Sequence, residues 1–499
     1  MNSPLTSSDR RWWALGVLSI TQLMVALDAT VINIALPHAQ RDLHFSIANR
    51  QWLITAYALS FGSLLLIGGR LSDMWGRRTS LYVGLAGFAT ASALGGWAHN
   101  FATLVTARAV QGVFGAVLAP AALAALSTTF GDPKERAKAF SIYGAIGASG
   151  AAIGLLLGGA LTQWASWRWC LFINLFFAAF AIVGVVFFVA GGKRENAANL
   201  DVFGTLLGSA GLFFVVYGFA HAVNTGWGND ITWGSLVIGV ALLVAFVRWQ
   251  QRSKNPLLPL RLLINRVRGG SLVALFLTSI GIFGISLFLA YYLQGTLGYS
   301  PLRTGVAFLP LVAAIALSAF IASARLLAVN GPRPLIPTGM LLSMMGMVLF
   351  TRLTPNADYF SNVLPGLVVT GLGLGLIFAP AIASATAGVG PSDVGAASAL
   401  VNTTQQIGGS MGLALLNTIA VSVTARSNRV PVAISAQFSR KEQLHHAAVL
   451  ATLHGYAVAF WWAAVFFGAG AILTFGLLES GVPDHEGGVP ALGQISGHG

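Results

Sequence analysis

Long apolar runs, separated by short polar segments, occupy most of this chain of 499 residues. A helix needs about 20 mainly apolar residues to cross the hydrocarbon part of a bilayer. Fourteen runs meet that length, so the sequence predicts an all-α membrane protein with 14 transmembrane helices. The predicted ranges are 12–36, 51–69, 79–98, 101–123, 139–162, 170–190, 202–221, 232–249, 270–294, 304–324, 335–352, 363–387, 396–422 and 454–478.

Composition excludes a soluble protein and a nucleic-acid partner. Charged residues make up 9% of the chain, whereas soluble domains carry about 25%. The net charge of +13 comes from Lys and Arg in short loops between the spans, where such residues determine topology. Cys170 is the only cysteine, so an intrachain disulfide is excluded. The first apolar run is interrupted by Asp28 and too long for a signal-peptide core, so no cleavable signal peptide is expected.

The distribution of cations predicts the orientation. With the N-terminus inside, 18 of the 28 Lys and Arg fall in inner segments and nine in outer ones. Because cytoplasmic loops carry the excess of Lys and Arg, both tails, 1–11 and 479–499, are expected in the cytoplasm. The outer loop predicted at about 423–453 is an exception, since it holds four of the nine outer cations and no sequence feature explains them.

An internal repeat divides the chain. GRLSDMWGRRTSLYVG (69–84) aligns with ARLLAVNGPRPLIPTG (324–339), and GAVLAPAALA (115–124) with GLIFAPAIAS (375–384). We therefore expect two pseudo-symmetric six-helix halves, 12–190 and 270–478, with a two-helix central insert and its inner loops at 191–269. Two parallel halves around a central path are typical of secondary transporters. The loops carry no Walker motif, so ATP is not expected to drive transport.

Asp28 is the one acidic residue, out of fifteen, that lies deep inside a predicted span. Ionisable groups in the hydrocarbon region are costly and usually functional. A carboxyl group there takes a proton more readily where burial dominates and less readily beside a cation. The position suits proton exchange, although a permanent ion pair is the alternative.

Arg108 is the matching cation. Counted from the predicted outer ends of their helices at 1.5 Å per residue, Arg108 and Asp28 lie about 10 and 12 Å deep. We expect them to communicate directly, through water or through Gln111, either as a proton-controlled pair or as a static link between helices. The repeat places Val368 at the Arg108 position and apolar residues near Ile282 at the Asp28 position. Proton handling is therefore expected in the N-terminal half alone.

The segment GRLSDMWGRR (69–78) is predicted as an inner loop between the second and third spans. Two glycines permit a tight turn, and Asp73 is suited to cap a helix N-terminus and to accept hydrogen bonds from the neighbouring arginines. The segment is either a conformational latch or topology charge alone. The latch would comprise Gly69, Asp73, Gly76, Arg77 and Arg78.

Glycines form a stripe on the fifth predicted helix. Small residues let helix backbones approach closely in lipid. The stripe is either static packing or a sliding surface between the halves, and the sequence favours neither. Its members are Gly147, Gly150, Gly154 and Gly158, together with Gly159.

Other polar and amphipathic groups lie in the spans. They are either interhelical hydrogen-bond partners or the lining of a cavity with apolar walls, which suits lipophilic or amphipathic ligands. The candidates are Asn33, Tyr57, Gln111, Asn174, Tyr291, Gln294, Asn402 and Gln406. The histidines lack metal-ligand spacing, and no nucleophile–base pattern is present, so neither a metal nor an enzyme site is expected.

These motifs resemble the major facilitator superfamily, and within it the fourteen-helix drug:proton antiporters. The resemblance rests on LDATVINIALP (27–37), GRLSDMWGRRTSLYVG (69–84), LVTARAVQGVFGA (104–116), GAIGASGAAIGLLLGGAL (144–161), WRWCLFIN (167–174) and GAASALVNTTQQIGGSMG (395–412). Two prolines of the family pattern are replaced, by Leu155 and within Leu175–Phe176, which removes expected kinks.

The resemblance implies a proton-binding role for Asp28, a coupled cation in Arg108 and a latch around Asp73. It implies a multi-pass antiporter of the bacterial cytoplasmic membrane that exports lipophilic or cationic drugs or toxic compounds and confers antibiotic resistance. The proton gradient would drive it without a cofactor, and a monomer is expected. Alternatives are an exporter of one host metabolite or a non-transporting sensor; a channel or a membrane enzyme is disfavoured.

Overall fold

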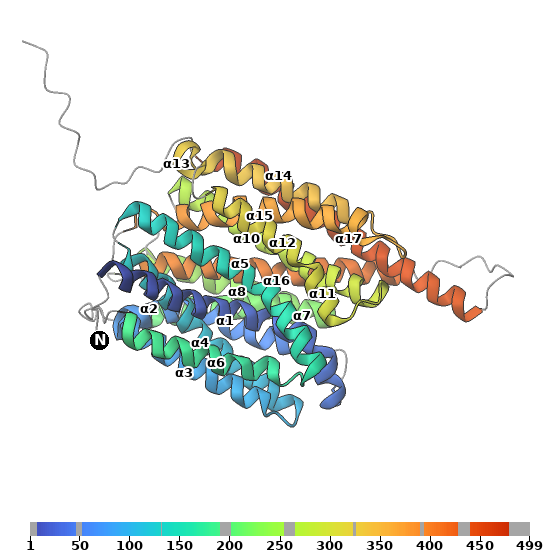
Figure 1. Cartoon of the computed structure of the whole chain (residues 1–499), viewed down its shortest axis with the longest axis horizontal. Coiled ribbons are helices and arrows are strands. Elements are labelled where there is room, and N and C mark those ends of the chain that lie inside the picture. The colour runs from blue at the N-terminus through green and yellow to red at the C-terminus, as the bar shows by residue number, and fades with distance from the viewer. Residues whose placement is uncertain are drawn as a thin grey trace, which may run out of the picture.

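The computed structural model describes residues 7–45, 52–130, 132–189, 201–253, 265–322, 326–389, 394–427 and 440–478. Within these ranges every secondary-structure element is a helix, and the long helices pack side by side into one bundle (Figure 1). The expected all-α fold class is confirmed.

The first part of the bundle consists of α1 (Ser7–Asp42), α2 (Trp52–Trp75), α3 (Arg77–Gly96), α4 (Phe101–Thr129), α5 (Pro133–Trp164) and α6 (Trp169–Phe188). Two further helices follow, α7 (Val202–Thr225) and α8 (Asp230–Gln250). The last part consists of α10 (Arg266–Gly284), η2 (Ile285–Leu289), η3 (Tyr292–Thr296), α11 (Pro301–Ala307), α12 (Leu309–Ile321), α13 (Leu327–Asn330), α14 (Pro332–Phe350), η5 (Tyr359–Val363), α15 (Leu364–Thr386), α16 (Val394–Ser427) and α17 (Arg440–Leu477).

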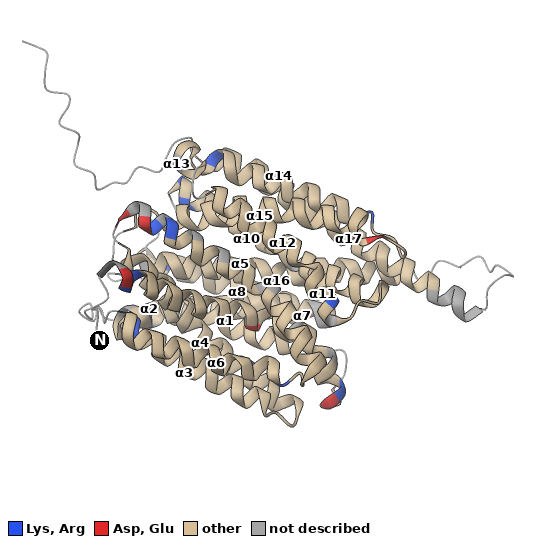
Figure 2. Cartoon of the chain, viewed as in Figure 1, with Lys and Arg blue, Asp and Glu red and all other residues tan. Residues whose placement is uncertain are grey.

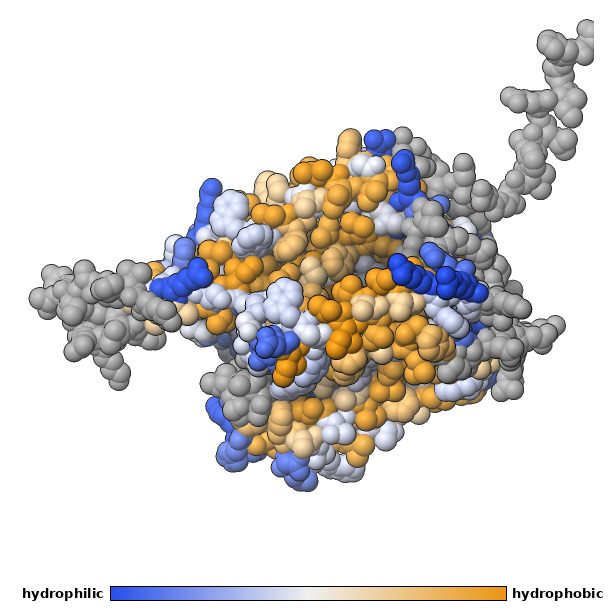
Figure 3. Space-filling model, turned by 180° about the vertical axis from the view of Figure 1, so that it is seen from behind, coloured by the Kyte–Doolittle hydropathy of each residue, from blue (hydrophilic) through white to orange (hydrophobic). Residues whose placement is uncertain are grey.

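Length and composition fit a membrane protein. Eleven helices in the described ranges are long and apolar enough to cross a bilayer, and Trp52–Leu65 and Ile153–Trp164 are shorter apolar stretches. Lys, Arg, Asp and Glu gather at the two ends of the bundle (Figure 2). Between these ends hydrophobic side chains cover the middle of the molecular face in Figure 3. A bilayer would solvate this band, since lipid tails are as apolar as the side chains that it presents.

Several predicted boundaries are wrong in detail. The predicted helix 304–324 is divided at Phe308, because Pro310 has no backbone N–H to continue the ladder. The predicted helix 270–294 ends in two π-helical turns, η2 and η3. The outer loop predicted at about 423–453 is shorter, since α16 runs to Ser427 and α17 begins at Arg440.

The turn between α2 and α3 is a single residue. Gly76 has φ of +85°, and Gly331, its partner in the internal repeat, has φ of +70°. Glycine adopts this left-handed region without the steric penalty of a side chain. The prediction that Gly69 belongs to the same turn is wrong, because α2 continues through Gly69 to Trp75. Both repeat copies therefore bend at the aligned glycine.

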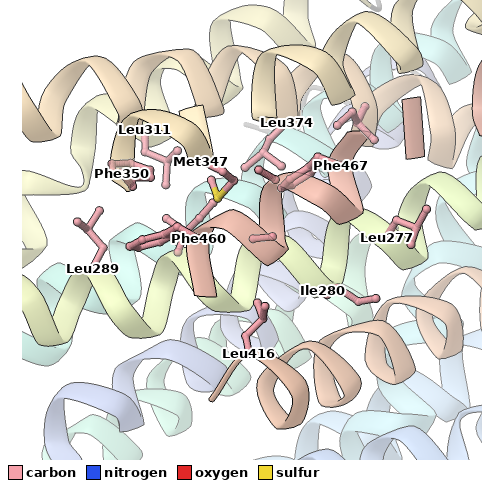
Figure 4. Close-up of a cluster of buried hydrophobic side chains, with 14 of the residues drawn as sticks. Leu277, Ile280, Leu289, Leu311, Met347, Phe350, Leu374, Leu416, Phe460 and Phe467 are labelled. Atoms are coloured by element: carbon pink, nitrogen blue, oxygen red, sulfur yellow. The ribbon is translucent and has the colours of Figure 1, made fainter. Parts of the chain in front are cut away.

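The last part of the bundle has one continuous apolar core. Side chains from α10, α12, α14, α15, α16 and α17 meet there (Figure 4). Phe460 of α17 packs on Phe350 of α14, with ring centroids 5.3 Å apart. The same core includes Ile34 of α1 and Leu155 of α5. Leu155, which replaces a proline of the family pattern, thus packs against the opposite part of the molecule, and α5 continues to Trp164.

The two parts also meet along α5 and α16. Helix α5 packs against α11, α12 and α15, while α16 packs against α2 and α4. A Cβ atom on Gly305 of α11 would lie 3.0 Å from the Leu156 Cα atom of α5. The backbones of α5 and α11 are therefore in direct contact near the predicted outer ends of these helices.

Asp201 joins the ends of α7 and α8. Its Oδ1 atom accepts hydrogen bonds from the backbone N–H of Gly204 and from Trp249 Nε1, both at 2.8 Å. Its Oδ2 atom accepts a bond from Gln250 Nε2 at 2.9 Å. Burial raises the pKa of this carboxyl group, but the accepted hydrogen bonds outweigh burial and leave the pKa below its ordinary value.

Replacing Asp201 by alanine should lower stability by about 0.5–2 kcal/mol at neutral pH, because α7 loses its N-cap. A depressed pKa in the folded state stabilises the protein fully above the unfolded-state pKa of about 3.9. This stabilisation is lost as the pH falls through the folded-state value. The melting temperatures of wild type and Asp201→Ala should therefore converge at acidic pH.

Asp230, in the exposed first turn of α8, provides the control. Asp230→Ala also removes a carboxylate from this pair of helices. Among the described residues that carboxylate makes no hydrogen bond to the other helix, so the melting temperature should stay closer to wild type. A deficit in Asp201→Ala that persisted unchanged at acidic pH would contradict the role of the ionised carboxylate.

Candidate functional site

An ion pair links α1 and α4 in the interior of the bundle. Arg108 Nη1 donates a hydrogen bond to Asp28 Oδ2 at 2.6 Å, and each side chain is 1% exposed. The sequence placed the two residues at one depth, and the structure brings them into direct contact. Both charges are desolvated, so each depends on the other and on nearby hydrogen bonds.

The second carboxylate oxygen is held by two amides. Asp28 Oδ1 accepts a hydrogen bond from Gln111 Nε2 of α4 at 2.8 Å and another from Asn174 Nδ2 of α6 at 2.7 Å. Gln111 Oε1 in turn accepts a hydrogen bond from Arg108 Nη1 at 2.7 Å. Gln111 therefore hydrogen-bonds to both members of the ion pair. The sequence analysis had named Gln111 as one possible link between Asp28 and Arg108.

Ser92 of α3 completes the arrangement. Its Oγ atom accepts hydrogen bonds from Asn174 Nδ2 at 2.9 Å and Gln111 Nε2 at 3.1 Å, and donates one to the Leu171 carbonyl at 2.8 Å. The hydroxyl uses its donor and both of its acceptor positions. The sequence analysis missed Ser92, because serines are common in apolar helices and nothing in the local pattern distinguishes this one.

Helix α2 contributes the remaining contacts of Arg108. Arg108 Nε donates to the Leu53 carbonyl at 3.3 Å, and the guanidinium carbon lies 4.5 Å from the centroid of the Tyr57 ring. Tyr57 itself stacks on Phe61. A cation over an aromatic face is stabilised electrostatically, the more so when water is excluded. The ion-pair centre, as we call Asp28, Ser92, Arg108, Gln111 and Asn174, thus receives contacts from α1, α2, α3, α4 and α6.

Apolar layers lie on both sides of this centre. On α1, α4 and α6 the polar residues fall between members of two separate clusters of buried apolar side chains, and Ser92 falls between Phe88 of α3 and Ala98, just beyond the end of α3. One cluster includes Val25, Phe88, Ala116 and Ala178, and the other includes Val31, Ala98, Leu104 and Leu171. A centre enclosed in this way has a low effective dielectric constant, which strengthens its internal electrostatic interactions.

The candidate cavity residues divide into two groups. Tyr57, Gln111 and Asn174 are buried in or against the ion-pair centre. The remaining candidates with described side chains lie elsewhere: Tyr291 is 45% exposed, Gln294 and Gln406 are partly buried, and Asn402 donates to Ser398 in its own helix. The side chain of Asn33 lies outside the described part of the structure.

The glycine stripe of α5 faces α1. A Cβ atom on Gly150 would lie 2.7 Å from Ala26 Cβ, and one on Gly158 would lie 3.1 Å from the Val31 carbonyl oxygen. Gly154 is the tightest point, where a Cβ atom would overlap Thr30 Oγ1. The described contacts of the stripe are therefore within the first part of the bundle, and the contact of α5 with α11 uses a different face.

Arg78 of the predicted latch contacts α6 and its own helix. Arg78 Nη2 donates to the Val186 carbonyl at 2.9 Å, which connects α3 with the end of α6, and Nε bonds Tyr82 in its own helix. Asp73 lies in the last turn of α2 and the N-cap of α3 is Gly76, so the expectation that Asp73 caps α3 is wrong. The side chain of Asp73 lies outside the described part of the structure.

A second polar group lies at the predicted outer ends of α1 and α6. Arg168 Nη2 forms an ion pair with Asp42 Oδ2 at 2.9 Å, and Arg168 Nη1 donates to the Ala98 carbonyl at 2.6 Å. Asp42 and Arg168 line an open pocket of about 550 Å³, which His38 also lines. Burial, followed by the charge of Arg41, lowers the pKa of His38.

Comparison with known proteins settles the family. The profile of the Major Facilitator Superfamily matches residues 18–413, which include the ion-pair centre. The chain belongs to the Major Facilitator Superfamily. The resemblance to the superfamily inferred from the motifs is thereby confirmed, and the protein is a transporter-family member that spans the membrane many times.

Two of the relatives are named for drug resistance or efflux. The puromycin resistance protein of Streptomyces alboniger is 48% identical over 473 residues, which cover 94% of this chain and 92% of that protein. The multidrug efflux pump LfrA of Mycolicibacterium smegmatis is 31% identical over 435 residues, which cover 87% and 85%.

A solved structure agrees with the superfamily fold. The human organic anion transporter MFSD10 superposes with a TM-score of 0.59 at 16% sequence identity, over 93% of this chain and all of that one. At this identity the likeness shows the fold alone. It supports the helical arrangement that places α1 and α4 side by side.

Proposed function

We propose that this protein is a proton-coupled antiporter that exports lipophilic or cationic compounds across the bacterial cytoplasmic membrane. The observation that carries the proposal is the fully buried Asp28–Arg108 pair, which lies between two apolar layers. A buried carboxylate inside a membrane protein is a typical proton site. Similarity to a puromycin resistance protein and to a multidrug efflux pump supports drugs or toxic compounds as the cargo.

The proposal includes a topology of 14 spanning helices. Helices α2, α3 and α5, which have 24, 20 and 32 residues, would cross the membrane together with the eleven apolar ones. The two six-helix halves would be α1–α6 and the helices from α10 to α17, with α7 and α8 inserted between them. The excess of Lys and Arg in the predicted inner segments supports cytoplasmic termini. We expect the carrier to act as a monomer.

In the proposed cycle, Asp28 takes up a proton and releases Arg108. Protonation removes the negative charge that holds Arg108 Nη1, Gln111 Nε2 and Asn174 Nδ2 at one carboxylate. Arg108 keeps Gln111, the Leu53 carbonyl and the Tyr57 ring as partners in α2 and α4. Helix α1 then moves with less restraint against α4. The membrane potential would contribute about 2.3 kcal/mol per proton for each 100 mV.

A dedicated exporter of one compound is the second candidate. The relative at 48% identity is named for resistance to a single antibiotic, puromycin, whereas the multidrug pump is only 31% identical. A panel of structurally unrelated antibiotics and cationic dyes distinguishes the two. Protection against one compound class would favour the dedicated exporter, and protection against several would favour multidrug efflux.

An efflux assay in a pump-deficient bacterial strain tests the function. Cells that express the protein should accumulate less puromycin or cationic dye than control cells, and a protonophore should abolish the difference. Asp28→Asn, expressed at the same level, should accumulate as much as the control because its amide does not exchange protons. Export that ignores the protonophore, or that survives in Asp28→Asn, would exclude proton coupling through this residue.

A further inference from the structure

Asn174 contains an acceptor without a partner. Its side chain is 0% exposed, its Nδ2 atom donates to both Asp28 and Ser92, and its Oδ1 atom has no hydrogen-bond partner among the residues that the structure describes. A buried polar atom without a hydrogen-bond partner destabilises the folded protein. Asparagine therefore lowers the stability of the folded protein at this position, unless its oxygen accepts a hydrogen bond in another state of the centre.

The other acceptors of the ion-pair centre are all engaged. Gln111 Oε1 accepts from Arg108, and Ser92 Oγ accepts from both amides while it donates to the Leu171 carbonyl. The two oxygens of Asp28 accept from Arg108, Gln111 and Asn174. Every bond at Asp28 thus suits the ionised carboxylate. A protonated carboxyl group also needs an acceptor, and Asn174 Oδ1 is the member of the centre that has none of its capacity in use.

An amide can serve either form of a carboxyl group. Asn carries two N–H donors and one carbonyl acceptor on the same planar group. Its nitrogen is attracted to a carboxylate, and its oxygen is repelled by it. For the protonated acid the preference reverses, because the O–H group donates.

We propose that Asn174 is a positioning residue that binds Asp28 in both protonation states. Its Nδ2 atom donates to the carboxylate, and after a half-turn of the amide its Oδ1 atom accepts the O–H of the protonated acid. Ser92, 2.9 Å from the amide, can then turn its O–H from the Leu171 carbonyl toward the same oxygen. The proton is transferred from hydronium: one O–H bond of hydronium breaks, one O–H bond forms on Asp28, and a water molecule remains. This role rests on the proposed proton coupling.

The surroundings of Asp28 limit the alternatives. Arg108 on α4, Tyr57 on α2 and Cys170 on α6 are the charged or titratable groups that interact with it in the described part of the structure. The Arg108 guanidinium has no acceptor atom, and the sulfur of Cys170 is only a weak acceptor. Asn174 is the neutral group beside Asp28 whose carbonyl oxygen accepts no hydrogen bond in the described part of the structure.

Infrared difference spectroscopy of the full chain in lipid nanodiscs tests the proposal. A pH titration should show the carboxyl band of Asp28, identified by its loss in Asp28→Asn. With isotope-labelled asparagine, the same spectrum should contain a shifted side-chain amide carbonyl band. That band should be absent in Asn174→Leu and in Asp28→Asn. A labelled wild-type spectrum in which Asp28 becomes protonated without any asparagine band would overturn the proposal, even if Asn174→Leu did not fold.

The pH midpoint of Asp28 protonation gives a second readout. If Asn174 only donates to the carboxylate, Asn174→Leu should raise the midpoint by about one pH unit, the equivalent of one charge-assisted hydrogen bond. If Asn174 serves both states, one bond is lost from each and the midpoint should move by less than about half a unit. A rise of a full unit would reject the dual role but leave proton coupling intact. A wild-type carboxyl band that ignored pH would instead reject the proposed function.

Discussion

Replacing Arg108 by methionine should abolish export and lower the free energy of unfolding by about 3–5 kcal/mol, the usual cost of leaving a buried charge without its partner. Asp28 is 1% exposed and its Oδ2 atom has Arg108 Nη1 as hydrogen-bond donor. Methionine replaces the apolar part of the arginine side chain but supplies neither charge nor hydrogen-bond donor. Chemical denaturation in mixed micelles measures the loss of stability, and the efflux assay measures export.

A double variant isolates the buried charge as the cause. Combining Arg108→Met with Asp28→Asn removes both charges, so much of the lost stability should return while export stays absent. Arg303→Met is a control for arginine removal, because Arg303 is exposed and lies over the Tyr299 ring at 3.9 Å. That change should cost about 1 kcal/mol or less. Equal destabilisation of the single and double variants would show that the ion pair contributes no charge compensation.

Replacing Gly154 by alanine should cost about 1–3 kcal/mol through overpacking and should reduce export strongly. The added Cβ atom would overlap Thr30 Oγ1 and lie 2.9 Å from the Leu27 carbonyl oxygen. Backbone atoms cannot rotate away, so α1 must shift from α5. Leu27 and Thr30 flank Asp28, and the shift would therefore also disturb the contact with Arg108. Melting temperature and efflux should fall together.

Gly144 offers a matched control on the same helix. A Cβ atom there would meet no atom of the described residues within 4 Å. Gly144→Ala should be neutral or stabilise the helix by up to about 1 kcal/mol, since alanine has the higher helix propensity. If Gly144→Ala impaired the protein as much as Gly154→Ala, close packing on α1 would not be the explanation.

The sequence was sufficient for features that depend on length along a helix. Apolar runs long enough to span a bilayer predicted the helices, and the fixed rise per residue placed Asp28 and Arg108 at one depth. The glycine turn at Gly76 was also predictable, because its repeat partner Gly331 is a glycine. Each of these predictions uses a property of one chain segment: the length of an apolar run, the rise per residue of a helix or the residue at a turn.

Rotation about the helix axes was not predictable in the same way. Depth gives the level of a residue but not its direction, so Asn174 was assigned to a possible cavity and Ser92 was not noticed. Both point into the ion-pair centre. Gly69 was placed in a loop because polar residues follow it, yet a helix continues through polar residues at a membrane surface. These features depend on contacts between segments that lie far apart in the chain.

The ion-pair centre has a consequence for how the protein is made. A single charge near the middle of a spanning helix costs about 2.5–3.5 kcal/mol during membrane insertion. The partner of Asp28 lies 80 residues later in the chain, and Asn174 lies 146 residues later. During synthesis α1 must therefore carry an uncompensated charge until α4 has left the ribosome. Pairing of α1 with α4 then offsets the free-energy cost of the unpaired charge on each helix. We therefore expect these two helices to associate early in the assembly of the nascent chain.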